Sequence, residues 1–566
     1  MIAHYLKIAW RNLRKYKTQT IISMLGLTIG VVFFAYGYHW YQYETSYDSF
    51  YPDSDRIYRV YGIEKSTLRH QASIPYAAVK AIEKDFPEIE KIAVVYNKFS
   101  ISFTYDDKTI DAPEIIYVDE DFFKMFPPHV ICGSLDDDLF AKKEIHDMVV
   151  TEKFARQFFE TPENALGKQL TAPSYHASYI IKAVIKDQPS NSIFQATCYV
   201  ADFTVRQIAA ESEEKIQWNY FYQAQLYIQF GEHVNRKTFE EKLLDYAIDN
   251  DYNTNLLFAI SPLRMIKHDI NEGWAFAKQT GFDLPYIRTF LLAGILLLLS
   301  VFFNWLNVLI NSIVKRYQEV NLRKVSGAGT STFLVQLFVE IGLLILFVVV
   351  VSFCVAELTA SSFERLFHTV IVRQRLNKIL LVTFILITVF LYAVLVISLR
   401  RFLQKASFRK NVNKSHIQRT LSTGRISLVI QLVVGAFFIM SAYVFWQQIR
   451  FMQKVDWGIS KDHIIQVGIV GPDKNAILEE IKQLSSVVEV CATGLFTINN
   501  EAGPFSQSNV QWEGRPGDFH PFFQVVDVAY NFVSFFDLDI LSGRDFTDAD
   551  LSSDIGKALI NEEALR

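Results

Sequence analysis

Long apolar stretches divide the sequence into membrane-spanning and water-soluble parts. A helix needs about 20 apolar residues to cross roughly 30 Å of hydrocarbon, because each residue adds ~1.5 Å. Five stretches meet this length: Thr20–Trp40, Thr289–Asn311, Phe333–Val355, Ile379–Leu399 and Ile426–Trp446. The second and third contain the uncharged runs LLAGILLLLSVFF and LLILFVVVVSF, which are too long for buried strands. The pattern predicts an α-helical polytopic membrane protein with about five transmembrane helices.

The first stretch could be either a cleaved signal peptide or a retained membrane anchor. Basic residues precede it, as in a signal peptide. Its apolar run is too long for one, however, and it ends in aromatic residues around Trp40 instead of a small-residue cleavage site. Aromatic side chains are typical of membrane–water interfaces. We therefore expect a retained span with Trp40 at the interface.

The charge of the connecting segments predicts the orientation. Residues 1–19 carry five Lys and Arg and no acid, and residues 400–425 carry eight and no acid. Such loops face the cytoplasm, and 312–332 falls on the same side by parity. Residues 356–378, with four basic and two acidic residues, argue weakly against this arrangement. The predicted N-terminus is cytoplasmic, and the two large soluble segments lie outside.

Each part of the chain is thereby given a place. The predicted order is an amphipathic helix at 1–19, a first span at 20–40, an extracytoplasmic α+β domain at 41–288, a second span at 289–311, a cytoplasmic loop at 312–332, a third span at 333–355, an outer loop at 356–378, a fourth span at 379–399, a basic linker at 400–425, a fifth span at 426–446 and a second, incomplete α+β domain at 447–566.

The first soluble segment mixes strand and helix patterns. Ile57–Tyr61 alternates as a strand does, and Tyr76–Phe86 has helical periodicity between two prolines. Met148–Val150 predicts a strand that leads into a helix capped by Thr151.

The chain also resembles itself at a constant offset of 410 residues. The matched pairs are Phe122 and Phe532, Phe126 and Phe536, Gly133 and Gly543, Val150 and Ile560, Glu152 and Glu562, and Arg156 and Arg566. This regularity predicts a tandem duplication whose second copy is truncated at Arg566. Completed like the first, the second copy would bring the number of spans to eight. A natural end of the gene after Arg566 would refute this expectation.

Composition excludes several classes of function. A net charge of -4 argues against a nucleic-acid partner, and the mean hydropathy of +0.15 fits a protein that is partly in lipid. The four cysteines have no zinc or redox spacing, although Cys132 and Cys198 could pair in an oxidising compartment. Asp136, Asp137 and Asp138 lack the spacing of a calcium loop. We expect no catalytic residue, no metal site and no cofactor bound by this chain.

A nucleotide-binding loop is absent by sequence. Leu166-Gly167-Lys168-Gln169 comes nearest to one, but it lacks the first glycine and the hydroxyl of that motif, so a turn is predicted there.

The N-terminal residues 2–17 have the pattern of an amphipathic helix. Apolar residues lie along one face and basic residues along another, which predicts a helix lying in the lipid headgroups. A simple basic topology signal is the alternative. The predicted membrane-interface residues are Lys7, Trp10, Arg11, Arg14 and Trp40.

The cytoplasmic segment Val314–Phe333 is charged and contains a glycine break at 327–329. Its pattern is equally consistent with two interpretations: an element that docks on another protein, or a solvated loop.

Several segments carry a resemblance to the FtsX-like permeases, the membrane subunits of MacB/LolCDE-type ABC transporters. QEVNLRKVSGAG at 318–329 resembles their EIGLRKALGA-type signature, with Asn321 in place of the usual glycine, and 304–307 resembles their asparagine-rich second span. LKIAWRNLRKYK at 6–17 resembles their amino-terminal helix. SYDSFYPDSDRIYRVYG at 46–62 and ILSGRDF at 540–546 resemble the MacB-like periplasmic core domain.

The resemblance implies a mechanism and partners. In this family the loop between the second and third spans acts as a coupling helix on a cytoplasmic ABC ATPase dimer, which holds the ATP and Mg, so this chain is not itself the enzyme. The matching positions are Glu319, Leu322, Arg323, Lys324, Gly327 and Ala328. The other partners implied are membrane lipids and a periplasmic adaptor or lipoprotein. The expected location is the inner membrane, with the large domains periplasmic.

Two functions follow as hypotheses. The first is a permease subunit that works by mechanotransmission, coupling ATP hydrolysis to periplasmic domain motion for export, lipoprotein extraction or signalling. The alternative is an ATPase-independent transmembrane sensor or scaffold with ligand-binding ectodomains. A channel is disfavoured because the spans contain almost no charge. The substrate is left open.

Overall fold

The computed structural model of the chain divides into two compact units. One comprises residues 1–45 and 280–455, and the other 46–279 and 456–566. The structure describes residues 2–15, 17–65, 70–106, 108–135, 139, 146–172, 177–201, 223–249, 256–267, 284–315, 330–408, 414–455, 458, 463–467, 474–493, 505–507, 510, 512, 515, 523–547, 550 and 556–565.

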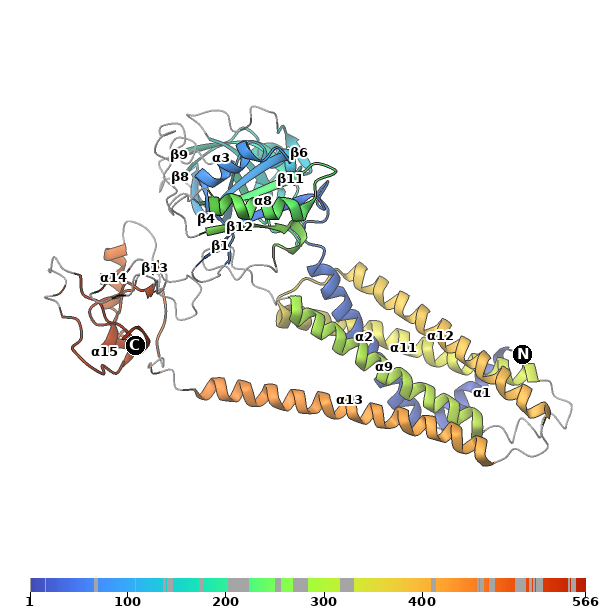
Figure 1. Cartoon of the computed structure of the whole chain (residues 1–566). Coiled ribbons are helices and arrows are strands. Elements are labelled where there is room, and N and C mark those ends of the chain that lie inside the picture. The colour runs from blue at the N-terminus through green and yellow to red at the C-terminus, as the bar shows by residue number, and fades with distance from the viewer. Residues whose placement is uncertain are drawn as a thin grey trace. The chain divides into compact units, whose positions relative to one another are not determined.

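The first unit, called the membrane unit here, contains helices and no strands where it is described (Figure 1). Its helices are α1 (Ile2–Lys15), α2 (Lys17–Glu44), α9 (Leu284–Lys315), α11 (Thr330–Phe367), α12 (Arg373–Phe408) and α13 (Lys414–Lys454). Five segments of these helices are long and apolar enough to cross a membrane: Thr20–Glu44, Leu284–Asn307, Val335–Phe367, Arg373–Ile397 and Val429–Lys454. Long apolar helices are therefore confirmed at all five predicted spans.

The helices are longer than the apolar pattern alone suggested. α11 has 38 residues. At ~1.5 Å per residue that is roughly 57 Å, well beyond the hydrocarbon thickness. α11 ends at Phe367 and α12 begins at Arg373, so most of the segment 356–378 is helical and only 368–372 is a connector. The difference arises because the apolar pattern marks the lipid boundary, whereas a helix continues until its backbone is capped.

α2 lies at the centre of the membrane unit and approaches α9 closely. A Cβ atom on Gly37 would lie 3.3 Å from the Cα of Leu291, and one on Gly294 would lie 3.2 Å from the Cα of Phe34. Small residues let helix backbones pack tightly where lipid provides no hydrophobic drive. Half of the most apolar window of α2 is buried by such contacts, but none of the corresponding window of α13 is.

The soluble unit contains one large sheet of mixed strands. The strands are β1 (Ile57–Glu64), β2 (His70–Gln71), β3 (Ile74–Pro75), β4 (Ile89–Tyr105), β5 (Lys108–Val118), β6 (Val130–Gly133), β7 (His146–Thr151), β8 (Gln169–Ala172), β9 (Ala177–Ile185), β10 (Cys198–Ala201), β11 (Gln223–Phe230) and β12 (Leu256–Pro262). Their order is β12-β1-β11-β4-β5-β10-β7-β9-β6, with β2, β3 and β8 pairing beside this path. Neighbours are antiparallel except β5 with β10 and β7 with β9.

Helices cover the sheet and complete three apolar clusters. The helices of this domain are α3 (Tyr76–Asp85), α4 (Phe122–Met125), α5 (Glu152–Phe159), α6 (Pro162–Ala165), α8 (Arg236–Asp249) and the 3-10 turn η2 (Leu263–Met265). Ile82 of α3 and Phe239 of α8 pack with β1, β11 and β12, and Phe154 of α5 packs with β7 and β9. A third cluster, built around Phe122, joins α4 to the middle of the sheet.

The local predictions for this domain are confirmed. β1 begins at Ile57, α3 spans the predicted helix, and β7 leads into α5. The Thr151 hydroxyl oxygen accepts a hydrogen bond from the Phe154 amide at 3.4 Å, as an N-cap does. The segment 166–169 includes a turn in which Gly167 has a φ of 75°.

The later part of the soluble unit, after α13, has short elements where it is described. They are α14 (Lys474–Lys482), β13 (Phe505–Gln507), β14 (Phe523–Val525), α15 (Phe532–Phe536) and α17 (Glu562–Leu565), with β13 and β14 antiparallel.

The strand register separates the two cysteines that could have paired. Cys198 on β10 lies opposite Val150, which lies opposite Val184, which lies opposite Cys132 on β6. Three strand spacings put the two Cα atoms roughly 14 Å apart, beyond the ~7 Å limit of a disulfide. Both thiols are accordingly free.

Reduction should therefore leave the thermal unfolding midpoint of the protein unchanged. Cys198 is fully buried, and burial raises the pKa of its thiol, whereas Cys132 is partly exposed. We expect a maleimide to label Cys132 at least ten times faster than Cys198 in the native protein, as measured by peptide mass spectrometry. Equal rates, or a lower midpoint with reductant, would contradict this arrangement.

Candidate functional site

The segment that joins α2 to β1 is held by a buried carboxylate. Asp48 is 0% exposed, and its two carboxylate oxygens accept hydrogen bonds from the Ser192 hydroxyl at 2.6 Å and the Ile193 amide at 3.1 Å. The Asp48 amide donates to the Asn191 carbonyl at 3.0 Å, and the Asn191 side-chain amide donates to the Ser46 carbonyl at 2.9 Å. A buried charge is tolerated only when it is hydrogen-bonded in this way.

Aromatic packing strengthens this attachment. The Tyr51 ring lies 5.1 Å from the Phe126 ring and 6.2 Å from the Phe194 ring, and its hydroxyl donates to the Gln188 side-chain oxygen at 3.2 Å. Burial raises the pKa of Tyr51, which keeps the hydroxyl protonated as a donor.

The segment by which the chain leaves the domain is bonded to the segment by which it enters. Arg264 pairs with Asp55 at 2.9 Å, and the Lys267 ammonium donates to the Tyr47 hydroxyl oxygen at 2.7 Å. Residues 46–56, 188–194 and 263–267 are called the connector clamp below. Because it joins entry and exit, the two passages of the chain are held together at this edge of the domain.

In the membrane unit, an aromatic cluster lies where α2 ends and α9 begins. Trp40 is only 2% exposed, and its ring lies 5.6 Å from Phe290 of α9, 6.0 Å from Phe363 and 4.9 Å from Phe367 of α11. Tyr36 stacks on Phe363 at 4.6 Å. This aromatic cluster joins α2, α9 and α11 at the end of the unit from which the soluble domain is connected.

Polar contacts tie the same helices together. The Tyr36 hydroxyl donates to the Ala356 carbonyl at 2.5 Å and lies 2.8 Å from the Thr359 hydroxyl. His39 accepts a hydrogen bond from the Val372 amide at 3.2 Å through Nε2, so this nitrogen carries no proton. The connector 368–372 is thereby attached to α2.

Charges in this region are partly neutralised locally. Arg373 lies 3.6 Å from both Glu357 and Glu364, and Glu364 also accepts from the Ile371 amide at 3.0 Å. These contacts place both acids of the segment beside Arg373, while the number of Lys and Arg in 356–378 stays the same and the orientation stays a prediction. The sequence did not predict the ion pairs of Arg373 or the hydrogen bond to His39. The opposite charges within 356–378 and a histidine near the end of the first span were the features that could have indicated these contacts.

The predicted site residues have different positions in the structure. Lys7, Arg11 and Arg14 are exposed on α1, and Trp10 lies beside them. Trp40 packs inside the bundle against protein, not on its outer surface, and its place at the membrane interface stays a prediction. The predicted coupling residues Glu319, Leu322, Arg323, Lys324, Gly327 and Ala328 lie outside the described residues, as do Asp136, Asp137 and Asp138.

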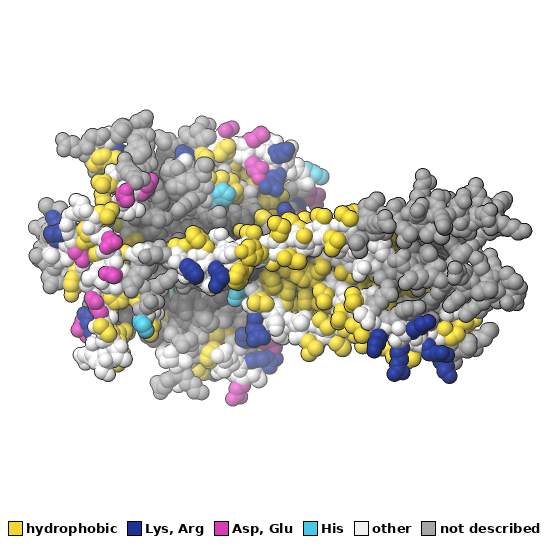
Figure 2. All heavy atoms as spheres, turned by 90° about the horizontal axis from the view of Figure 1, so that it is seen from below, with side chains coloured by type: hydrophobic (Ala, Val, Ile, Leu, Met, Phe, Trp, Pro, Cys, Tyr) yellow, Lys and Arg dark blue, Asp and Glu magenta, His cyan; other side chains and the backbone are white. Residues whose placement is uncertain are grey.

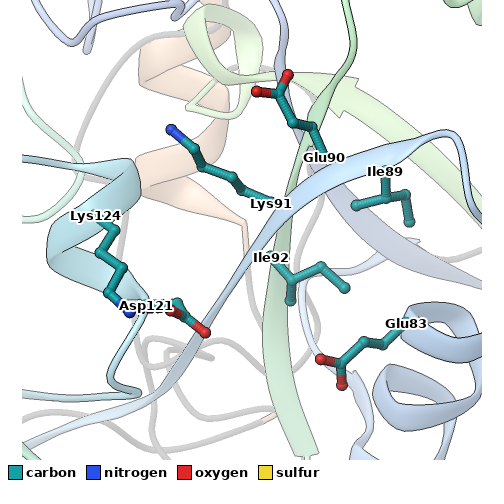
Figure 3. A pocket seen from close by; sticks show the side chains of 7 residues that line it. All are labelled: Glu83, Ile89, Glu90, Lys91, Ile92, Asp121 and Lys124. Atoms are coloured by element: carbon teal, nitrogen blue, oxygen red, sulfur yellow. Dashed lines mark ion pairs between the residues drawn. The ribbon is translucent and has the colours of Figure 1, made fainter. Parts of the chain in front are cut away.

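The soluble domain also has a polar hollow of about 320 Å³ beside the start of β4 (Figure 3). Its lining residues are Glu83, Ile89, Glu90, Lys91, Ile92, Asp121 and Lys124. Lys124 pairs with Asp121 at 3.0 Å, and three acids and two lysines are among the lining residues. It contains no serine, cysteine or histidine to act as a nucleophile or base. Among the described residues of the chain, no group of His, Cys, Asp and Glu could hold a metal ion.

One family model matches the first span together with most of the mixed domain. Residues 20–246 match the family model of the MacB-like periplasmic core domain. The chain carries a MacB-like periplasmic core domain. The match begins in α2 and continues to α8, so it includes the first span, most of the connector clamp and most of the sheet. It supports a membrane permease subunit of the ABC transporter type with a periplasmic domain. No curated relative matches the sequence at a significant level.

Solved structures similar to the chain include three domains of this kind. A domain of a putative permease from Porphyromonas gingivalis is 21% identical and covers 38% of this chain and 92% of its own, with a TM-score of 0.32. The periplasmic region of MacB from Actinobacillus actinomycetemcomitans is 16% identical, with coverages of 38% and 92% and a TM-score of 0.28. The extracellular domain of the noncanonic ABC-type transporter YknZ from Gram-positive bacteria is 14% identical, with coverages of 36% and 99% and a TM-score of 0.27.

The connector clamp predicts a specific effect of replacing Asp48. Asp48→Asn keeps a residue that tolerates the φ of 52° but substitutes an amide for one of two accepting oxygens. We expect faster amide hydrogen exchange at Ile193 and Phe194 and a loss of about 1–3 kcal/mol in unfolding free energy. The matched control is Asp106→Asn, which changes an exposed residue with a φ of 44°. Equal effects of the two substitutions would show that the buried hydrogen bonds contribute nothing.

Proposed function

We propose that this chain is the permease subunit of an ABC-type machine that transmits motion from a cytoplasmic ATPase to the MacB-like domain. The aromatic cluster supports this most directly. It joins α11 to α2 and α9, the two helices through which the soluble domain is connected to the membrane unit. α9 and α11 also flank the predicted coupling loop 312–332. A displacement of that loop would therefore reach both helices that carry the domain.

Continuous helices are suited to this task. α9 has 32 residues, and α2 packs on it through closely approaching glycines, so the pair resists independent sliding. The connector clamp would then pass the displacement to the sheet, because both chain passages are bonded there. Two coupled sites acting on one two-state element are sufficient for such a mechanism.

In this proposal the ATPase partner docks on the loop between α9 and α11. The charged contacts would come from Glu319, Arg323 and Lys324, and the apolar contact from Leu322. The small side chains of Gly327 and Ala328 would let the ATPase approach the loop backbone closely. ATP and Mg lie on the partner. The N-terminus is cytoplasmic and the domain lies in the periplasm. Lipids surround the spans, and a periplasmic adaptor or lipoprotein is a further candidate partner.

We also infer that residues 447–566 repeat the first soluble domain. At the offset of 410, α15 corresponds to α4, and the ring pairs Phe122 with Phe126 and Phe532 with Phe536 lie at 5.1 and 4.9 Å. Gly133 and Gly543 have φ values of 87° and 92°. Both favour the interpretation of a tandem duplication.

A matching helix cap supports the same inference. Thr151 accepts from the amide of Phe154, and Asn561 accepts from the amide of Ala564 at 3.0 Å, which are the same two positions 410 residues later. A helix cap at the same offset favours the duplication, although the capping residues themselves differ.

The coupling proposal is tested by purifying the full-length chain with its ATP-binding partner. We expect Glu319→Ala combined with Arg323→Ala to abolish co-purification or lower the stimulated ATPase rate at least tenfold. The matched control is Glu479→Ala combined with Arg515→Ala, outside the membrane unit, which should leave both unchanged. A partner that stays bound and fully stimulated would refute the assignment of the loop. Absence of any ATPase partner would favour the sensor or scaffold.

The aromatic cluster predicts that transmission of motion to the domain can be lost while ATPase binding is kept. Trp40→Ala removes the ring that contacts both α9 and α11, so ATPase binding should persist while motion no longer reaches the domain. We expect the ATP-dependent change in hydrogen exchange at residues 46–56 to fall by at least half.

Trp40→Phe should restore most of this change, because a smaller ring still fills part of the site. The control is Trp446→Ala, since Trp446 is half-exposed on α13. A normal exchange response in Trp40→Ala would exclude the aromatic cluster from the coupling.

A further inference from the structure

The N-terminal helix α1 has three distinct faces. One packs on the membrane unit: Ala9 is 0% exposed, and Leu13 contacts its buried core. α1 packs along α11, and Trp10, at the edge of this face, has its ring 6.0 Å from the ring of Phe347. The helix is thus docked on protein by one side only.

A second face is apolar and uncovered. Leu6 is 42% exposed and Trp10 is 53% exposed. At about 100° per residue, these two side chains project roughly 60° and 100° around the helix from Ala9. Ile21 and Ile22, at the start of α2, are also more than half exposed. An uncovered apolar strip beside the first span suits the acyl region of a bilayer better than water.

The third face is basic. Lys7, Arg11 and Arg14 are exposed and project roughly 140° to 200° from Ala9, directly beside the apolar strip. No acidic residue precedes Glu44 in the sequence, so α1 itself carries no negatively charged side chain. Figure 2 shows Lys and Arg side chains gathered beside apolar side chains on the membrane unit.

We propose that α1 is a binding surface for anionic phospholipid, with Lys7, Arg11 and Arg14 on the headgroup phosphates and Leu6 and Trp10 among the upper acyl chains. The apolar strip lies directly beside the cations and needs a hydrocarbon partner. This arrangement favours a phospholipid, which has both a phosphate and acyl chains, over a free anion as the ligand. Each cation near an anionic lipid surface contributes a severalfold gain in affinity. This proposal does not depend on the ATPase coupling, and either can fail without the other.

The test uses the full chain in nanodiscs made from an equal mixture of phosphatidylglycerol and phosphatidylcholine. After extraction into detergent, the lipids that remain bound are quantified by mass spectrometry. We expect phosphatidylglycerol to be enriched in the wild type, and this enrichment to fall at least tenfold in Lys7→Gln/Arg11→Gln/Arg14→Gln. Glutamine preserves side-chain length and helix propensity while removing charge.

The matched control is Lys84→Gln/Lys153→Gln/Lys237→Gln, which removes the same charge from exposed positions of the soluble domain. It should keep the wild-type enrichment. Unchanged enrichment in the α1 variant would overturn the proposal. So would equal losses in both variants, which would show an effect of net charge alone.

Two further measurements keep the proposal testable if the triple variant fails to fold. Arg11→Gln alone should lower the enrichment about fivefold or less. In the wild type, the thermal stabilisation by phosphatidylglycerol over phosphatidylcholine should shrink when the salt is raised from about 0.1 M to 1 M, because the screening length falls from ~10 Å to ~3 Å. A stabilisation independent of salt would exclude charge recognition.

Discussion

The demand for backbone hydrogen bonding in lipid determines the rest of this structure. Inside hydrocarbon the backbone amides and carbonyls have no water to bond, and a single apolar segment satisfies all of them within itself only as a helix. The mixed sheet, whose edge strands and loops need water, must therefore lie outside and be connected through helix ends. Two helices, α2 and α9, carry the first soluble domain, and everything that reaches it from the membrane passes along them.

Contacts at the two ends of this connection are of different kinds. Within the membrane unit, aromatic rings and small-residue packing join α2, α9 and α11, because lipid provides little hydrophobic drive and close packing has to supply the attraction. Within the soluble domain, the connector clamp uses a buried carboxylate, hydroxyls and ion pairs. The first set joins three helices, and the second joins the two passages of the chain through the edge of the domain.

α2 and α13 illustrate how similar sequences acquire different surroundings. Both are apolar, follow a basic segment and lead into a soluble domain. α2 is buried by α9, α11 and α12, whereas the apolar window of α13 has no buried residue. The difference lies in the presence of neighbouring helices, which is a property of the assembled bundle. Short sequence patterns give the opposite case: Phe122 and Phe126 place their rings 5.1 Å apart, and Phe532 and Phe536, with the same spacing along the chain, place theirs 4.9 Å apart.

Sequence alone was sufficient to predict the five apolar helices, the strand at Ile57, the helix after Thr151 and the kind of periplasmic domain, because these depend on short-range periodicity, capping and motif identity. The aromatic cluster around Trp40, the Asp48 clamp and the separation of Cys132 from Cys198 were decided only by the tertiary structure. Trp40 was expected among lipid headgroups, since an aromatic residue at a span end is typical of interfaces. Whether it meets lipid or a neighbouring helix depends on partners 250 to 330 residues away. Such contacts follow from packing and strand register, which no local pattern encodes.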